Sequence, residues 1–481
     1  MKPKNSRNLI ILVHPGEVTN WLWEDNFPFM PFESLFLARY LEEHGYDVMI
    51  VDQRVDGEWK QRVRGVVDQI LWVGVTAISG PQVTDALKAA ADIREIDADL
   101  PIVWGGWHPS FFPEKTINHP LADFVVTGIG ELKVVQLSEF IAGGMKGELD
   151  VPGLLKKGVV KPVVPVKEKF TDLVEIPAYH LIDPDKYRSK NNMAGLITAR
   201  GCPFRCSFCT IAQIAYINRP IESVLNEIRH LIGDLGFEYL NFADGHFFAQ
   251  RARVLQIIDR MHEEGHDFKW NAGARPETLG KFRPHELERI MNSGLQQIMI
   301  GAESGSDVML ERIVKDAKPE DIVETARITG EYGIRLSLSF MSGLPYETTE
   351  DLRKTIDVVE KVVTLNPQAK VINPIYQPIP GAPSYDQMLE LGWTPPETLE
   401  AWGESISWNQ QIEDIECFPW MKPAEFDEYV EVFQNSIFGK VRTIHFTGQE
   451  RSADVSVSGT SGELGVSVAE AAKNEGTAAS D

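Results

Sequence analysis

The sequence predicts an α/β protein in which a doubly wound parallel sheet is followed by a partial barrel of β/α units and a small C-terminal helical segment. Short apolar runs alternate with helix-like stretches over most of the chain, which is the pattern of parallel β/α units. The chain has 481 residues, whereas a single core stops growing at roughly 250 to 300 residues. Residues 141–190 are rich in Gly, Pro, Val and Lys without a sustained period. We therefore expect two domains, at 1–140 and 191–390, joined by a linker at 141–190.

The first domain is expected to contain five strands separated by helices. The helical segments are SLFLARYLEEHG, VTDALKAAADIREI and GELKVVQLSEFIAG, and the strands are LIILVH, DVMIVD, ILWVGVTAIS, PIVWGG and DFVVTG. Such a series forms a Rossmann-like sheet whose ligand lies at the carboxyl ends of the strands. Residues 1–140 therefore have the pattern of a cofactor-binding domain.

The second domain is expected to contain six strands, which predicts a partial (β/α)6 barrel of the TIM type. The strands are AGLITAR, EYLNFAD, FKWNAGA, QQIMIGA, IRLSLSF and KVINPIYQP. In such barrels the catalytic groups lie where strands end and loops begin. An aromatic-rich stretch at 391–447 predicts a lid with a closing amphipathic helix. Ser, Thr, Gly, Ala and Glu dominate residues 448–481, which predicts a disordered tail.

Composition excludes several classes of protein. The formal charge of -23 argues against a nucleic-acid partner, because phosphate binding draws on clustered Lys and Arg. The N-terminus carries an apolar run of only about five residues, too short for a signal peptide or a membrane span. We therefore expect a cytoplasmic protein with no membrane span. Four cysteines make no disulfide scaffold in a chain of this length, and in a reducing compartment a tight group of cysteines indicates metal ligation.

Three of the cysteines lie close together after the first barrel strand. Cys202, Cys206 and Cys209 have the spacing C-x3-C-x2-C in RGCPFRCSFCTIAQ. Three thiolates on a short loop can bind three irons of a 4Fe-4S cubane and leave the fourth iron open. The alternative is a structural zinc site, which needs four ligands and could be completed by His246 or Glu303. Cys417 lies far along the chain, and we expect it to be a small buried hydrophobe.

This motif, with an aromatic residue before its last cysteine, resembles that of the radical S-adenosylmethionine (SAM) superfamily, and the resemblance covers residues 190–390. It implies a 4Fe-4S cluster that cleaves SAM to a 5'-deoxyadenosyl radical, with flavodoxin or ferredoxin as the electron donor. The loops SGLPYET and PIPGAPSY correspond to the adenine side of the family's SAM site. Other strand ends match the family in order, and the resemblance assigns SAM binding to Phe208, Asp244, Gly245, Arg275, Glu303 and Ser304.

The first domain resembles the cobalamin-binding domain of one large radical SAM subfamily, which includes class B methyltransferases and the anaerobic Mg-protoporphyrin monomethyl ester cyclases. The matching text is VGVTAISGPQ, WGGWHPSFFPE and DFVVTGIGE; the subfamily typically lacks the D-x-H-x-x-G signature of a cobalt-ligating histidine, as this chain does. A nucleotide-binding fold that lost its ligand is the alternative. The residues that the resemblance assigns to cobalamin binding are Ser79, Gly80, Gly105, Gly106, His108, Gly128 and Glu131.

The resemblance implies methylation of an unactivated carbon, with two SAM molecules consumed per turnover. Radical oxidative cyclisation, ring formation or rearrangement is the alternative within enzymes, and a non-catalytic corrinoid or iron-sulfur carrier or sensor is the alternative outside them. We expect a small-molecule substrate of apolar or planar character. Aromatic residues that could contact it, or equally form core, are Trp393, Trp402, Trp408 and Trp420.

Overall fold

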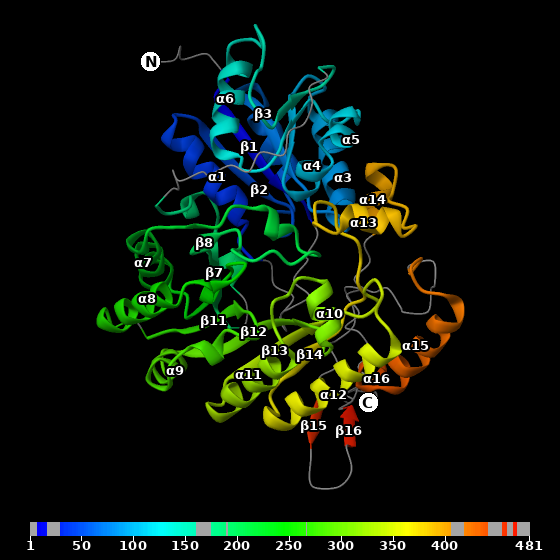
Figure 1. Ribbon diagram of the computed structural model, residues 1–481. Helices are drawn as coiled ribbons and strands as arrows, with labels where there is room; N and C mark the ends of the chain where they lie inside the picture. The colour runs from blue at the N-terminus through cyan, green and yellow to red at the C-terminus, as the bar shows by residue number, and fades with distance from the viewer. Residues whose placement is uncertain are drawn as a thin grey trace, which may run out of the picture.

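The computed structural model describes residues 7–16, 29–159, 175–188, 191–265, 267–405, 418–440, 455–458 and 465–468. Two α/β units lie one above the other, with the N-terminal unit uppermost in Figure 1 and a curved second sheet beneath it. The C-terminal helices α13 (Tyr385–Glu390) and α14 (Leu399–Ser405) reach from the second unit back to the first. Cys417 and Trp408 fall outside the described residues.

The first sheet has six strands in the order β2-β1-β3-β4-β5-β6, and all neighbours except β5 and β6 are parallel. The strand order reverses between β1 and β3, which places a topological switch point, the usual ligand site of such sheets, at their carboxyl ends. The strands are β1 (Leu9–His14), β2 (Asp47–Asp52), β3 (Ile70–Thr76), β4 (Ile102–Gly105), β5 (Phe124–Val126) and β6 (Leu154–Lys156).

The sixth strand was not expected, because it comes from the segment predicted as a linker. β6 pairs antiparallel with β5, with Leu155 opposite Val125. Leu154 and Leu155 are both buried, so this short apolar pair extends the core of the first domain. The strand could not be recognised in the sequence, because its three paired residues are too few to show an alternating pattern.

Helices cover both faces of the first sheet, as its doubly wound topology requires. α1 and α6 pack together beside β1 and β3, whereas α2 and α3 pack together on the other face. α3 begins at Pro81, a favoured first helical residue, and buries Val83, Ala86, Ala90 and Ile93 at helical spacing. The helices are α1 (Phe32–Glu43), α2 (Trp59–Gly65), α3 (Pro81–Ile96), α4 (Trp107–Phe111), α5 (Pro113–Asn118) and α6 (Glu131–Ala142).

The second sheet contains the six predicted strands, all parallel and in the order β14-β13-β12-β11-β10-β7. Consecutive strands are neighbours, so their carboxyl ends lie along one edge in chain order and the loops after them meet there. The expected partial barrel is therefore confirmed. Its strands are β7 (Met193–Leu196), β10 (Tyr239–Phe242), β11 (Lys269–Ala274), β12 (Leu295–Glu303), β13 (Arg335–Phe340) and β14 (Lys370–Ile372).

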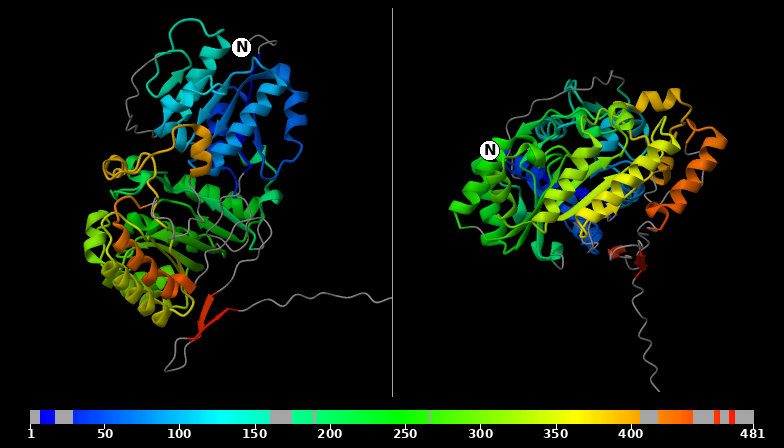
Figure 2. Two further views of the ribbon diagram at one scale, coloured as in Figure 1. Left: turned by 90° about the vertical axis from the view of Figure 1, so that its right-hand side faces the viewer. Right: turned by 60° about the horizontal axis from the view of Figure 1, so that its bottom comes forward.

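Helices line the outer face of this sheet (Figures 1 and 2). An additional antiparallel pair joins β8 (Ala199–Arg200) to β9 (Ile217–Asn218) beside the cysteine loop. The outer helices are α7 (Ile221–Arg229), α8 (Arg251–Glu263), α9 (Pro284–Met291), α11 (Pro319–Glu331) and α12 (Thr349–Leu365); the short α10 (Asp307–Arg312) follows β12.

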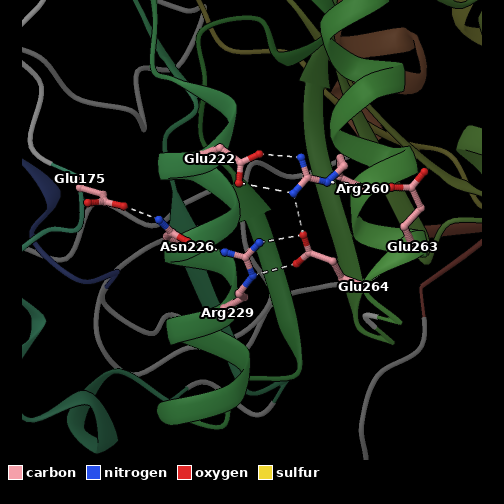
Figure 3. A network of polar contacts seen from close by, with 7 residues as sticks. All are labelled: Glu175, Glu222, Asn226, Arg229, Arg260, Glu263 and Glu264. Atoms are coloured by element: carbon pink, nitrogen blue, oxygen red, sulfur yellow. Dashed lines mark hydrogen bonds and ion pairs between the residues drawn. The ribbon is translucent and has the colours of Figure 1, made fainter.

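Ion pairs tie α7 to α8 on this outer surface (Figure 3). Arg229 binds both carboxylate oxygens of Glu264, at 2.8 and 2.7 Å. Arg260 joins the same carboxylate at 3.1 Å and reaches Glu222 at 2.6 Å. Exposed pairs of this kind contribute about 0 to 1 kcal/mol each. This network therefore orders the surface, whereas each helix is held to the sheet by its own apolar face.

The segment predicted as a lid divides into two parts with different partners. α14 (Leu399–Ser405) packs on α3 of the first domain, and α15 (Pro423–Asn435) packs along α12 of the second. α13 (Tyr385–Glu390) precedes α14, and α16 (Ile437–Lys440) follows α15. Trp402 on α14 is fully buried, so the segment joins the two domains rather than only closing the barrel.

The C-terminal segment contains one regular pair where the sequence predicted none. β15 (Val455–Ser458) pairs antiparallel with β16 (Gly465–Val468). Both strands alternate Val with Ser, and β-branched residues favour strands. No helix in the described parts of the chain is both long enough and apolar enough to cross a bilayer.

Candidate functional site

The three cysteines lie on the loop between β8 and the 3-10 turn Thr210–Gln213, at the carboxyl edge of the second sheet. Cys206 is buried and Cys202 and Cys209 are partly buried, and none is in a disulfide. The Cys209 N–H donates to the Cys206 carbonyl at 3.2 Å, which curls the loop. Gly245, a predicted site residue, approaches this loop closely, because a Cβ there would lie 3.7 Å from Cys202 Cβ.

The electrostatics of the loop suit ligands of a cluster. Burial raises the pKa of Cys202 and of Cys209, and a thiolate charge on Cys206 would raise both further. Arg275 and Lys315 act in the opposite direction on Cys202. Bound iron replaces the thiol protons and so offsets the cost of ionising the buried thiols. These three thiols beside two cations therefore fit a 4Fe-4S cluster.

A single-ion site gains no support from the geometry. Within the described ranges, no group of three or more His, Cys, Asp or Glu side chains is arranged to hold one metal ion. Three cysteine ligands of a cubane bind three different irons and need not converge on one point. Glu303, one of the residues considered for a zinc site, is already paired with Lys315 at 2.8 Å.

Arg275, which the resemblance assigns to SAM binding, lies directly beside the cysteines. Its Nη1 donates to Cys206 Sγ at 3.2 Å, and its Nε donates to Glu277 Oε1 at 2.9 Å. Its guanidinium stacks on the Phe204 ring, 3.9 Å from the centroid. Its Nη2 is buried and has no hydrogen-bond partner among the described residues, so one donor of the guanidinium is available to a ligand.

Two further buried polar atoms near Arg275 are also unpaired, and neither residue was assigned to SAM from the sequence. Over the described part of the chain, His246 Nδ1 and Glu277 Oε2 have no hydrogen-bond partner. His246 contacts the Phe204 ring at 5.5 Å. Burial lowers the pKa of His246 to about 4, so its imidazole is neutral at pH 7. A free guanidinium N–H, a free carboxylate oxygen and a neutral imidazole together match the carboxylate and ammonium of an amino acid.

Asp244, expected to meet the methionyl amine, is instead used within the protein. Its two oxygens accept from Thr198 N and Thr198 Oγ1, both at 2.5 Å. Burial raises the pKa of Asp244 to about 6. The carboxylate therefore orders the end of the first barrel strand. His246, two residues later, is the side chain that approaches Arg275 and Phe204.

Glu303 is the last residue of β12 and Ser304 follows it, close to the positions expected, but both have partners. Glu303 and Lys315 form a buried ion pair, and Glu303 has a positive φ of 64°. Ser304 Oγ accepts from the Ser306 N–H at 3.2 Å and lies 3.3 Å from Thr355 Oγ1. Lys315 was not identified from the sequence, and no motif marks it, since only the fold brings it to the cysteines.

Phe208 lines a pocket of about 310 Å³ beside the cysteine loop. The pocket combines that loop with the two loops expected on the adenine side, which follow β13 and β14. Lys315 Nζ lies 5.9 Å from the centre of the Phe208 ring. The lining combines apolar and aromatic side chains with polar ones. The apolar and aromatic residues include Phe208, Leu344, Pro345, Tyr346, Tyr376 and Met388, and the polar residues are Ser207, Arg312, Ser384 and Gln387.

The residues assigned to cobalamin follow β3, β4 and β5, at one edge of the first sheet. Gly80 and Gly106 have positive φ values of 104° and 97°. A Cβ on Gly106 would lie 2.7 Å from the Ala77 carbonyl oxygen, so only glycine allows the loops after β3 and β4 to approach so closely. Gly105 ends β4. The Gly128 N–H donates to Ser110 Oγ at 3.0 Å.

The side chains of His108 and Glu131 are buried and contact other protein groups, so neither faces an open ligand surface. His108 Nδ1 lies 2.8 Å from Ser79 Oγ, and its ring packs against Trp402 at 5.6 Å. Its Nε2 is buried without a hydrogen-bond partner in the described ranges, and burial lowers its pKa to about 4. Glu131 forms an ion pair with Arg200 of β8. Both residues therefore contribute to contacts between the first domain and the rest of the chain.

Two sequence families match the chain: the B12 binding domain at residues 27–138 and the radical SAM superfamily at residues 196–359. The chain therefore carries an N-terminal B12-binding domain followed by a radical SAM domain. A 4Fe-4S cluster, SAM and cobalamin are the cofactors that these two domains imply.

Among its relatives, an uncharacterized methyltransferase of Pyrococcus horikoshii is 28% identical over 346 residues, which cover 69% of this chain and 73% of that protein. The anaerobic magnesium-protoporphyrin IX monomethyl ester cyclase of Rubrivivax gelatinosus is 27% identical over 347 residues, which cover 69% of this chain and 61% of that protein. A radical SAM methyltransferase from Kitasatospora setae, solved with tryptophan and a SAM analogue, has the same fold. Its TM-score is 0.66 at 20% identity, with 80% of this chain and 76% of that chain covered.

Proposed function

We propose that this protein is a cobalamin-dependent radical SAM methyltransferase that methylates an unactivated carbon of a small apolar or planar molecule. The observation that carries the proposal is that the carboxyl-end loops of the two sheets meet. Phe111, after β4, lies against Gly381, after β14. Glu131, after β5, pairs with Arg200, two residues before Cys202. These contacts support a single site formed by the loops assigned to cobalamin and those assigned to the cluster.

Cys202, Cys206 and Cys209 would hold the cluster. When bound, the cluster supplies the electron that cleaves SAM, and cobalamin supplies the methyl group. The Arg275 Nη2 donor would bind the methionyl carboxylate, since a guanidinium suits that geometry. Glu277 Oε2 and neutral His246 Nδ1 would accept from the methionyl ammonium. This assignment replaces Asp244 with His246.

The aromatic pocket beside Phe208 would take the adenine and exclude water from it. Lys315 holds Glu303 at 2.8 Å, so the Glu303 carboxylate has a defined position at the end of β12. Ser304 orders the turn that follows through Ser306 and Thr355. The loops around Ser79, Gly80, Gly105, Gly106 and Gly128 would face the corrin, with His108 supporting Ser79 and not ligating cobalt. A low-potential flavodoxin or ferredoxin would donate the electron.

The test is an anaerobic assay of the reconstituted protein with dithionite and SAM, with and without methylcobalamin. We expect 5'-deoxyadenosine from the parent protein and none from Cys206→Ala, with corrinoid retained by both. Cys417→Ala is the matched control, since we expect that cysteine not to bind iron. A protein that holds a full cluster and corrinoid but forms no 5'-deoxyadenosine contradicts the proposal and indicates a carrier or sensor.

Oxidative cyclisation is the second candidate, and the similarity to the anaerobic cyclase of Rubrivivax gelatinosus favours it. The two reactions differ in the fate of the methyl group. Incubation with SAM labelled in its methyl carbon distinguishes them. Both reactions release labelled methionine when SAM is cleaved, but only methyl transfer places the label in the product formed from the substrate.

A further inference from the structure

Arg275 makes a contact that SAM binding does not require. Its Nη1 donates to the sulfur of Cys206 at 3.2 Å. Both residues are buried, with exposed fractions of 5% for Arg275 and 7% for Cys206. Of the three cysteines, Cys206 alone has a hydrogen bond from a side-chain cation to its sulfur among the contacts that the structure describes.

Three contacts hold the guanidinium in place against this sulfur. Glu277 accepts from Nε at 2.9 Å. The ring of Phe204, a residue of the cysteine loop itself, lies 3.9 Å from the guanidinium carbon. The Arg275 N–H donates to Thr278 Oγ1 at 3.2 Å, which fixes the backbone from which the side chain extends. The arginine is therefore preorganised, and its rotamer does not depend on a ligand.

A hydrogen bond and a positive charge at a cluster thiolate favour the reduced cluster, because the reduced state carries one more negative charge. Hydrogen bonds to the sulfurs and net charge are among the factors that set the potential of iron-sulfur clusters. Groups that contact the ligands of a metal commonly tune it. In a buried site the effect is screened little by water.

We propose that Arg275 raises the reduction potential of the cluster through its hydrogen bond to Cys206, with Glu277 and Phe204 as positioning residues. The proposal rests on the proposed function, because it assumes that Cys206 is a cluster ligand. It assigns Nη1 to the cluster thiolate and leaves Nη2 for the methionyl carboxylate. One electron from an external low-potential donor enters the cluster, and no bond forms or breaks in this step.

The experiment is a redox titration of the reconstituted protein in the absence of SAM, with the reduced cluster followed by electron paramagnetic resonance. Omitting SAM separates tuning of the cluster from binding of the methionyl carboxylate. The variants are Arg275→Gln and Arg275→Lys, and Arg327→Gln is the control. Arg327 pairs with Glu324 and Glu331 on the exposed surface of α11, so its replacement removes the same charge far from the cysteines. Iron and sulfide content is measured for every sample.

For Arg275→Gln we expect the ratio of reduced to oxidised cluster at a given applied potential to fall about tenfold, which for one electron corresponds to a midpoint about 59 mV more negative. Arg275→Lys keeps the charge but not the fork that reaches both Cys206 and Glu277, so its midpoint should lie between those of Arg275→Gln and the parent. Arg327→Gln should have the parent value.

An unchanged midpoint in Arg275→Gln with a full cluster overturns the inference and leaves the proposed function intact. If Arg275→Gln does not hold a cluster, Arg275→Lys decides: a midpoint equal to that of the parent overturns the inference, and a more negative one supports it. A parent protein that binds no cluster contradicts the proposed function itself, and the iron and sulfide analysis identifies that case.

Discussion

Glu131 and Arg200 form an ion pair that joins the two domains next to the cysteine loop. Glu131 is the first residue of α6 in the B12-binding domain, and Arg200 ends β8, two residues before Cys202. Their side chains are 8% and 21% exposed, respectively. The Arg200 guanidinium also lies 5.3 Å from the centre of the Phe36 ring of α1. The position of the cysteine loop is thus tied to two helices of the first domain.

Glu131→Gln should therefore loosen the joint between the domains. Removing one partner of a partly buried pair leaves Arg200 without its charge partner, which costs about 1 to 3 kcal/mol. We expect a lower Tm and weaker corrinoid retention, measured by thermal unfolding and by the corrinoid left after gel filtration. Arg39→Gln, which breaks an exposed pair with Glu43 within α1, is the control and should change neither. Unaltered Tm and retention in Glu131→Gln would show that the pair does not hold the domains together.

Gly106→Ala should disrupt the loops at the edge of the first sheet. The new Cβ would lie 2.7 Å from both the Ala77 carbonyl oxygen and Thr76 Oγ1, at a φ of 97°. The backbone conformation alone costs roughly 1 to 3 kcal/mol, and the overlap with backbone adds to it. We expect a lower Tm and loss of bound corrinoid. Gly45→Ala separates the two causes, because Gly45 has a φ of 82° but no atom within 4 Å of its would-be Cβ. Equal losses in both variants would mean that backbone strain, not the close approach, accounts for the effect.

Tyr429→Phe should destabilise the packing of α15 more at pH 8.5 than at pH 6. Tyr429 donates to Glu347 Oε2 at 2.6 Å, and the Gly343 N–H donates to the same oxygen at 2.7 Å. Burial raises the pKa of Glu347 to about 7, above its usual value, so ionisation of this carboxyl lowers the free energy of unfolding as pH rises from about 4.5 to about 7.

Without the Tyr429 hydroxyl, the Glu347 carboxyl loses a hydrogen-bond donor. The loss costs more when the carboxyl is ionised, because a hydrogen bond to a charged group is stronger than one to a neutral group. We expect a loss of about 1.5 to 3 kcal/mol at pH 8.5 and about 1 kcal/mol at pH 6. Urea unfolding at the two pH values measures this difference. Burial keeps the pKa of Tyr429 well above its usual range, so the hydroxyl is a donor at both. Tyr332→Phe is the control, since Tyr332 is 40% exposed. A larger loss at pH 6 than at pH 8.5 would contradict the assignment.

Trp402→Ala should release α14 from the first domain. The Trp402 ring is fully buried and contacts the rings of Phe112 at 4.9 Å and His108 at 5.6 Å. Truncation of a buried aromatic side chain costs about 3 to 5 kcal/mol. We expect faster hydrogen exchange in α14 and in the facing part of α3. Leu389→Ala, at a residue of α13 that is 39% exposed, should leave exchange unchanged. Protection of α14 equal to that of the parent would show that other contacts hold it.

Trp402 is also an example of what the sequence could not decide. It was equally compatible with core and with a substrate contact, and only its position between α14 and the first domain assigns it to the interface. Trp393 packs beside it, with ring centres 6.2 Å apart. Trp420 instead donates to the Gly343 carbonyl at 3.2 Å, next to the loop that Glu347 orders. The role of Trp408 stays a prediction, as does the set of residues that bind SAM and cobalamin.

The sequence by itself determined the two α/β units, the six strands of the barrel and the cysteine motif, because apolar periodicity and residue spacing are local properties of the chain. It could not determine which polar atoms are already used. Asp244 is bound by Thr198, Glu303 by Lys315 and Glu131 by Arg200. Nor could it place Arg275 against the sulfur of Cys206. These contacts join loops that are distant in sequence, so they depend on how strand order and helix packing bring the loop ends together, and only the tertiary structure decided them.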